Sequence, residues 1–163
     1  MILRLPRQDK VPRFGSVTIT LRPAVHEDVG FFWYLSQCPE IRAASLHPEA
    51  PSWPDHLAWY ERHHTTGLFY VAAELTGCPV GVIRFEQDGE VNVSVAIAPR
   101  HQGKGYGTWL IREASRLASH QFQHRIVAEI KDWNTASIHA FLKAGYAWYE
   151  AVGSIHRFEY ADR

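Results

Sequence analysis

A short segment with three glycines and a lysine is the part of this sequence best suited to bind an anion. It reads QGKGYGT, from Gln102 to Thr108, and it follows an apolar run that ends at Pro99. Glycine has no Cβ, so a ligand can approach the backbone closely there. A helical pattern begins at Tyr106, and the first N–H groups of a helix lack internal partners and carry partial positive charge. The segment therefore predicts a site for a group such as a pyrophosphate, with a glycine-rich turn between solvated cations as the alternative.

The spacing of these glycines excludes two familiar phosphate-binding loops. No Ser or Thr follows Lys104, as the loop of nucleoside triphosphatases requires. The glycines Gly103, Gly105 and Gly107 do not have the G-x-G-x-x-G spacing of a dinucleotide-binding fingerprint. The strand before them is also not the first strand of a βαβ unit.

The elements that must position this loop follow from hydrophobic periodicity and turn residues. Alternating apolar residues and tight turns predict strands at 17–24, 68–75, 80–86, 90–99, 124–131, 146–152 and 154–161. Apolar residues three and four apart predict helices at 26–37, 52–64, 106–121 and 134–145. Ser52 and Asn134 are the expected N-cap residues of two of these helices. Residues 38–51 contain three prolines and are expected to form an irregular loop.

This order of elements is typical of an α/β fold of the mixed α+β kind. It predicts a single central mixed, mostly antiparallel sheet flanked by helices, in the order β-α-α-β-β-β-α-β-α-β-β. A chain of 163 residues is long enough for one domain with a sizeable core. Residues 1–16 are expected to be a flexible N-terminal arm, and residues 17–163 to be the domain.

Composition argues against several classes of function. Seventeen basic residues balance seventeen acidic ones, whereas a nucleic-acid-binding protein usually has a basic excess. No apolar run approaches the roughly 20 residues of a membrane span, and the N-terminus does not read as a signal peptide. The two cysteines, Cys38 and Cys78, have no metal-binding spacing. We therefore expect a cytoplasmic protein with reduced thiols, no metal, and no nucleic-acid or membrane partner.

The glycine loop and its surroundings resemble the GNAT superfamily of acyl-CoA-dependent N-acyltransferases. The family signature is Gln or Arg, two residues, Gly, any residue, then Gly or Ala, and the segment from Gln102 to Gly107 matches it. The resemblance covers about residues 17–161, including the strand end VAIAP and the downstream segment NTASIHAFLKAGY. It implies an acetyltransferase domain of the expected fold that uses acetyl-CoA as co-substrate and no metal.

The resemblance also implies which residues hold acetyl-CoA. The strand before the loop would pair with the pantetheine arm, the loop amides would hold the pyrophosphate, and a downstream asparagine would lie near the thiol. An open strand edge suits the pantetheine amides, and a helix N-terminus suits a diphosphate. The residues concerned are Val95, Ala96, Ile97, Gln102, Gly103, Lys104, Gly105, Tyr106, Gly107, Thr108 and Asn134.

Acetyl transfer to an amine requires a base, donors for an oxyanion and a proton for the leaving thiolate. In one branch of the family a Glu lies five residues before the motif asparagine, where this chain has Glu129, although a salt-bridged strand Glu is the alternative. Another branch carries a carboxylate on the strand before the loop. There this chain has Asn92, with Ser94 on the same face, and either could orient a water or the amine. The usual tyrosine acid is replaced by Phe141, so no phenol acid is expected at that position.

Two segments of the sequence bear on the identity of the acceptor amine. The segments SWPDHLAWYERH and GVIRFEQDGEVNVSVAIAP resemble the GNAT branch that acetylates nucleotide-linked amino sugars. We therefore expect an N-acetyltransferase for a primary amine, such as that of a nucleotide-linked amino sugar. A protein N-terminus or a small-molecule amine is the alternative acceptor, and a non-catalytic acetyl-CoA-binding protein is the second alternative. The chain is expected to act as a monomer or a homodimer.

Overall fold

The computed structural model describes residues 13–161 of the chain. Most of the arm expected at residues 1–16 lies outside this range, and the described Arg13 and Phe14 form the short strand β1 beside β2. The strands are β1 (Arg13–Phe14), β2 (Val17–Pro23), β3 (Leu68–Glu74), β4 (Pro79–Asp88), β5 (Glu90–Ile97), β6 (Ile126–Lys131), β7 (Tyr146–Val152) and β8 (Ile155–Tyr160). The helices are α1 (Val29–Gln37), α2 (Pro39–Ala44), α3 (Trp53–His63), α4 (Tyr106–Ser119) and α5 (Thr135–Lys143).

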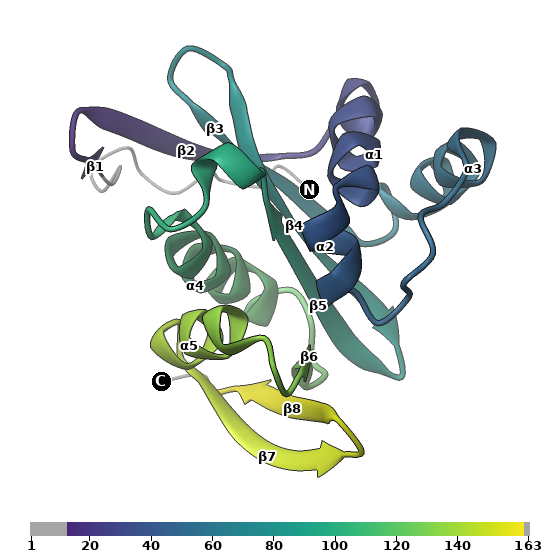
Figure 1. The fold of residues 1–163 in the computed structure, drawn as a ribbon, viewed down its shortest axis with the longest axis vertical. Helices are drawn as coiled ribbons and strands as arrows, with labels where there is room; N and C mark the ends of the chain where they lie inside the picture. The colour runs from purple at the N-terminus through teal and green to yellow at the C-terminus, as the bar shows by residue number, and fades with distance from the viewer. Residues whose placement is uncertain (1–12, 162–163) are drawn as a thin grey trace.

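All eight strands form one mixed sheet in the order β1-β2-β3-β4-β5-β6-β8-β7 (Figure 1). Every neighbouring pair is antiparallel except β5 and β6, which are parallel. This confirms the expected fold class. The N-terminal part of the sheet is the predicted meander, and β6, α5 and β7 follow as a crossover unit.

The sheet opens between β5 and β6. These two strands are paired only at Val91 with Ile126 and at Asn92 with Val127. Beyond Asn92, β5 continues beside β4 while β6 continues beside β8, so the two halves of the sheet separate. In Figure 1 the paired strands β4 and β5 diverge from β6 and β8 in this way. The consequence is an edge of β5 that has no partner strand among residues 13–161.

Helices cover both faces of the sheet, as predicted. Phe141 of α5 packs into a cluster with α4 on one face, and Phe32 and Tyr60 belong to a second cluster beneath α1 and α3 on the other face. Successive residues of β4 serve the two clusters in turn, with Val82 in the second and Ile83 in the first. Because successive side chains of a strand point to opposite faces, a strand covered on both faces is apolar along its length, which fits the apolar run that identified β4.

Residues 38–51 are not entirely irregular, as their three prolines had suggested, because α2 lies among them. Pro39 stands in the first turn of α2, where no N–H is needed and its fixed φ suits a helix. The helix ends at Ser45, whose N–H donates to the carbonyls of Ile41 and Arg42. This correction affects the site, because α2 supplies one wall of the cleft described next.

No helix within residues 13–161 combines the length and apolarity that crossing a membrane requires. Over the same described range, no three His, Cys, Asp or Glu side chains gather in a way that could hold a metal ion.

Candidate active site

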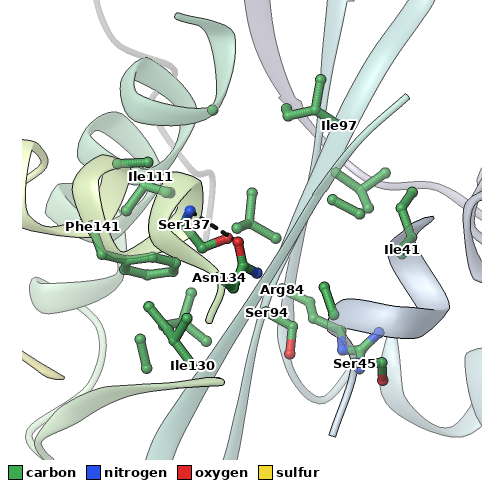
Figure 2. Close-up of a pocket in the computed structure, with 18 of the residues that line it drawn as sticks. Ile41, Ser45, Arg84, Ser94, Ile97, Ile111, Ile130, Asn134, Ser137 and Phe141 are labelled. Carbon is green, nitrogen blue, oxygen red and sulfur yellow. Dashed lines mark hydrogen bonds between the residues drawn. The ribbon is translucent and has the colours of Figure 1, made fainter. Parts of the chain in front are cut away.

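A cleft of about 1050 Å³ occupies the space where β5 and β6 separate. Its walls come from α2, β4 and β5 on one side and from β6 and α5 on the other, and the glycine loop closes one end. Figure 2 shows Asn134 and Phe141 on the α5 side of this cleft, and Arg84, Ser45 and Ile41 on the opposite side.

The edge of β5 that faces the cleft has free peptide groups. The N–H of Val91 donates to the carbonyl of Arg125 at 2.9 Å, so odd-numbered residues of β5 direct their peptide groups toward the β6 side. Because β6 has turned away, the N–H groups of Val95 and Ile97 face the cleft. The peptide groups of Ala96 face β4 instead, where Val82 is its register partner. Of the three predicted strand residues, two therefore present hydrogen-bonding groups to a ligand.

The glycine loop has the backbone that its composition predicts. Gly103 and Gly105 have φ values of 73° and 87°, in the left-handed region that favours glycine. Gly105 is the N-cap of α4, and no side chain caps the free N–H groups of this helix. The Gln102 side chain donates to the carbonyl of Ile97 at 3.0 Å and so ties the loop to the end of β5. The loop therefore presents backbone N–H groups at a helix N-terminus, an arrangement that suits an anion.

The other predicted loop residues surround this site in different ways. Gly107 and Thr108 line the cleft at the first turn of α4. Tyr106 also lines it, but its ring is only 3% exposed and packs against Phe14, so its backbone rather than its phenol is available. Lys104 lies within the loop, between Gly103 and Gly105, and its side chain is exposed.

His101 lies just before the loop and is buried, with only 6% of its surface exposed. Its burial, together with the positive charges of Arg100 and Lys104, lowers the pKa of this imidazole. The Nε of Arg100 donates to its Nε2 at 3.0 Å, and its Nδ1 is buried without a hydrogen-bond partner among the described residues. A neutral ring suits this position, because it lets the chain pack tightly against the loop without adding a buried charge.

Asn134 is the N-cap of α5, as predicted, and it lines the cleft across from β5. Its Oδ1 accepts from the N–H of Ser137 at 3.2 Å, shown as the dashed line in Figure 2. This bond fixes the side chain and leaves the amide N–H groups available for a ligand.

The position of the missing tyrosine is part of the core. Phe141 is 3% exposed, and its ring meets that of Tyr146 edge to face, with centroids 4.9 Å apart. The Tyr146 hydroxyl is in turn bonded to Ser115 at 2.7 Å, and burial raises its pKa far above the usual value. A buried phenol engaged in this way is poorly placed to give a proton to a leaving group.

Glu129 lines the cleft from β6, but it is also an ion-pair partner. Its Oε1 lies 3.1 Å from Nε of Arg157, a contact without hydrogen-bond geometry. The same arginine pairs with Glu90 and Glu150. The sequence allowed Glu129 to be either a cleft carboxylate or a salt-bridged strand residue. In the structure it is both.

Asn92 and Ser94 line the cleft together with two charged residues of β4. Register places Glu86 opposite Asn92 and Arg84 opposite Ser94, so all four side chains share one face of the β4–β5 hairpin. Arg84 and Glu86 are not among the site residues predicted from the sequence. The short turn at 87–89 was a signal for them, because it fixes which residues of the two strands stand opposite each other.

Known proteins resemble this chain both in sequence and in fold. A family model described as the acetyltransferase (GNAT) family matches residues 30–146. The solved structure of yncA from Salmonella typhimurium with its cofactor acetyl-CoA superposes with a TM-score of 0.73 at 24% identity, covering 86% of this chain and 92% of that one.

Two curated relatives are similar in sequence. YwnH of Bacillus subtilis, provisionally named a phosphinothricin acetyltransferase, is 29% identical over 79% of this chain and 84% of its own. The L-methionine sulfoximine/L-methionine sulfone acetyltransferase of Salmonella typhimurium is 33% identical over 56% of this chain and 58% of its own. The matched family model spans both walls of the cleft, the glycine loop and Asn134, and the chain therefore belongs to the GNAT family of acetyltransferases.

Proposed function

We propose that this protein transfers the acetyl group of acetyl-CoA to the amino group of a free amino acid or a close analogue. The observation that carries the proposal is the free edge of β5, which leads directly into the uncapped N-terminus of α4. An unpaired strand edge followed by an anion site matches the chemistry of a pantetheine arm followed by a diphosphate.

The acceptor class rests on the relatives. Their names refer to phosphinothricin, to methionine sulfoximine and methionine sulfone, and, for MnaT of Escherichia coli, to L-amino acids. None of these names refers to a nucleotide-linked amino sugar, so the branch expected from sequence lacks support. A free amino acid takes its place as the preferred acceptor.

Different residues would bind the cofactor, orient the amine and remove its proton. The N–H groups of Val95 and Ile97 would pair with the pantetheine amides, the loop amides would hold the diphosphate, and Asn134 would contact the cofactor near its thiol. Acetyl-CoA supplies, when bound, an acetyl group activated as a thioester. Ser94 and Asn92 would orient the amine, and Glu129 would remove its proton, directly or through a water.

The leaving thiolate needs no dedicated acid in this proposal. A free thiol has a pKa near 8.5, so the thiolate is a good leaving group and water can protonate it. Phe141 has no acidic proton, and the buried hydroxyl of Tyr146 is bonded to Ser115, so the mechanism takes no proton from either residue.

The test is an acceptor screen with the purified protein. Release of free thiol from acetyl-CoA is measured with L-methionine sulfone, L-phosphinothricin and other free amino acids. A nucleotide-linked amino sugar and spermidine serve as comparison amines. We expect turnover that saturates with at least one amino acid and stays near background with the comparison amines. Selective acetylation of the amino sugar would instead restore the acceptor expected from sequence.

A further inference from the structure

Two arginines lie in the same wall of the cleft, away from the glycine loop. Arg84 belongs to β4 and Arg42 to α2, and both line the cleft. In Figure 2, Arg84 extends from the sheet toward Ser45, the residue at the end of α2, with Ser94 beside it. The pantetheine and diphosphate sites proposed above use neither arginine.

Arg84 is held in place with part of its guanidinium unused. The group lies over the Trp59 ring, 4.7 Å from its centroid, and its Nε donates to Glu86 at 2.8 Å. Within residues 13–161 its two terminal nitrogens have no hydrogen-bond partner. Stacking on an aromatic ring and a single ion pair fix the plane of the fork and leave its outer edge for another acceptor.

Arg42 is a cation without a counter-charge. One terminal nitrogen donates to the carbonyls of His47 and Glu49 at 3.0 and 2.9 Å, and its Nε is buried with no partner. Across the described part of the chain, no carboxylate lies within ion-pair distance of it. Burial, followed by the charge of nearby Arg84, lowers the pKa of this guanidinium.

The carboxylates that also line the cleft do not neutralise the positive charges of Arg42 and Arg84. Glu86 is bound to Arg84, and Glu129 to Arg157 on the opposite wall. Glu40 and Asp88 are exposed. Two guanidinium groups therefore face one paired carboxylate, and a partly buried, unpaired cation is costly unless an anion joins it.

We infer that Arg42 and Arg84 bind the carboxylate of the acceptor, and that the enzyme selects amines that carry such a group. The inference rests on the proposed function, since it identifies how that acceptor is recognised. A guanidinium fork binds a carboxylate through two parallel, charge-assisted hydrogen bonds. In an α-amino acid the amine is one carbon from the carboxylate. An acid held by Arg84 therefore keeps its amine near Ser94, the residue opposite Arg84 on β5.

The kinetic test compares an amino acid with its own α-carboxamide, which keeps the amine and loses the negative charge. L-Methionine sulfone and its carboxamide are the pair. We expect the parent to prefer the acid by at least about 10-fold in kcat/KM, mainly through KM. Arg42→Gln and Arg84→Gln should each reduce kcat/KM for the acid by about 10- to 100-fold and change that of the carboxamide little.

Arg62→Gln is the matched control, because it removes an exposed arginine of α3 that does not line the cleft. This variant should behave as the parent does. The KM for acetyl-CoA should stay within about twofold in all three variants, which separates loss of acceptor binding from a distorted fold. Arg84→Lys, which keeps the charge but loses the fork, should recover only part of the preference.

Calorimetric titration of the same two compounds into the CoA-bound protein gives a readout that does not need turnover. Binding that favours the acid in the parent and not in Arg42→Gln supports the inference even if no transfer occurs, and that result would overturn only the proposed function. Transfer to the acid and the carboxamide with equal efficiency would overturn the inference and leave the proposed function standing. A loss of preference in Arg62→Gln as large as in Arg42→Gln would also overturn it.

Discussion

At the scale of single residues, Glu129 is the proposed base that removes a proton from the amine. Its carboxylate lines the cleft and also lies beside Arg157, which pairs with Glu90 and Glu150 as well. An ion pair alone does not exclude a catalytic role, because the side chain is 34% exposed and an oxygen can still reach a water in the cleft.

Glu129→Gln keeps the size of the side chain and removes the base. We expect kcat/KM at neutral pH to fall by about 100-fold, with partial recovery at high pH as the free amine becomes abundant. The measurement is the pH dependence of kcat/KM under saturating acetyl-CoA.

Glu150→Gln is the matched control, because Glu150 contacts the same arginine from β7 and does not line the cleft. Its profile should follow that of the parent. If both variants show the same small change, Glu129 has only a structural role and another group or bulk water takes the proton.

At the scale of elements, the proposed diphosphate site lies at the N-terminus of α4. Gly105→Asp would add a Cβ beside the Phe14 ring and a negative charge next to the N–H groups proposed to hold the diphosphate. We expect the stabilisation by acetyl-CoA, about 2.7 kcal/mol at 100 times its Kd, to disappear. Thermal unfolding with and without acetyl-CoA measures this difference.

Gly77→Asp provides the control for Gly105→Asp, since Gly77 also has a positive φ of 92° but lies in the turn before β4. Each variant should lose about 1–2 kcal/mol from backbone strain. Only Gly77→Asp should still be stabilised by acetyl-CoA as the parent is, and a retained response in Gly105→Asp would show that the diphosphate site lies elsewhere.

A second element-scale feature joins β2 to the start of α1. Asp28 accepts from both terminal nitrogens of Arg22 and from the N–H of Val25, all within 2.7 to 2.8 Å. Burial raises the pKa of Asp28, but these hydrogen bonds and the charge of Arg22 outweigh it, and the pKa ends below its usual value. A carboxyl with a lowered pKa stabilises the fold above its unfolded pKa, and that stability is lost as pH falls through the folded pKa.

Asp28→Asn should therefore cost about 1–3 kcal/mol of unfolding free energy at pH 7 and less near pH 2. Urea unfolding at the two pH values tests this. Glu27→Gln, an exposed neighbour, should change the stability by less than about 0.5 kcal/mol at either pH. An equal loss for Asp28→Asn at both pH values would contradict the linkage.

At the scale of the whole molecule, the two halves of the sheet are joined near the start of β5, at the end of the cleft away from the glycine loop. Besides the two residue pairs of β5 and β6, Arg157 of β8 pairs with Glu90 of β5 and so crosses the seam. Arg125 reaches Glu90 and Glu159 in the same network. A network of this kind is worth more than an isolated surface pair.

Arg157→Met should lower the unfolding free energy by about 1–3 kcal/mol, because it leaves three carboxylates without their shared partner. This corresponds to a fall in Tm of about 2–12 °C for a chain of this size. Arg116→Met removes only an exposed pair with Glu113 in α4 and should change Tm little. Equal Tm values for the two variants would show that the seam does not depend on Arg157.

Local chemistry made the main outline of the fold predictable. The turn residues of the hairpins, the apolar runs of β4 and β5, and the caps Ser52 and Asn134 each act over a few residues, and all are present where expected. The glycine turn and the helix start at Gln102–Thr108 were predictable for the same reason, because glycine backbone and a helix start are local properties. Within residues 13–161 the short strand β1 and the helix α2 were missed, α2 because a proline in a first turn reads as a loop breaker unless the helix after it is recognised.

What the sequence by itself determined is most of the elements, their order and the loop that begins α4. Tertiary structure alone decided that β5 and β6 part after two residue pairs, that Ala96 turns its peptide groups away from the cleft, and that Glu129 meets Arg157. It also brought Arg42 of α2 into the cleft with Arg84 of β4. The physical reason is that these contacts depend on packing between residues far apart in the chain. The local propensity of a segment does not determine which distant residues it will contact.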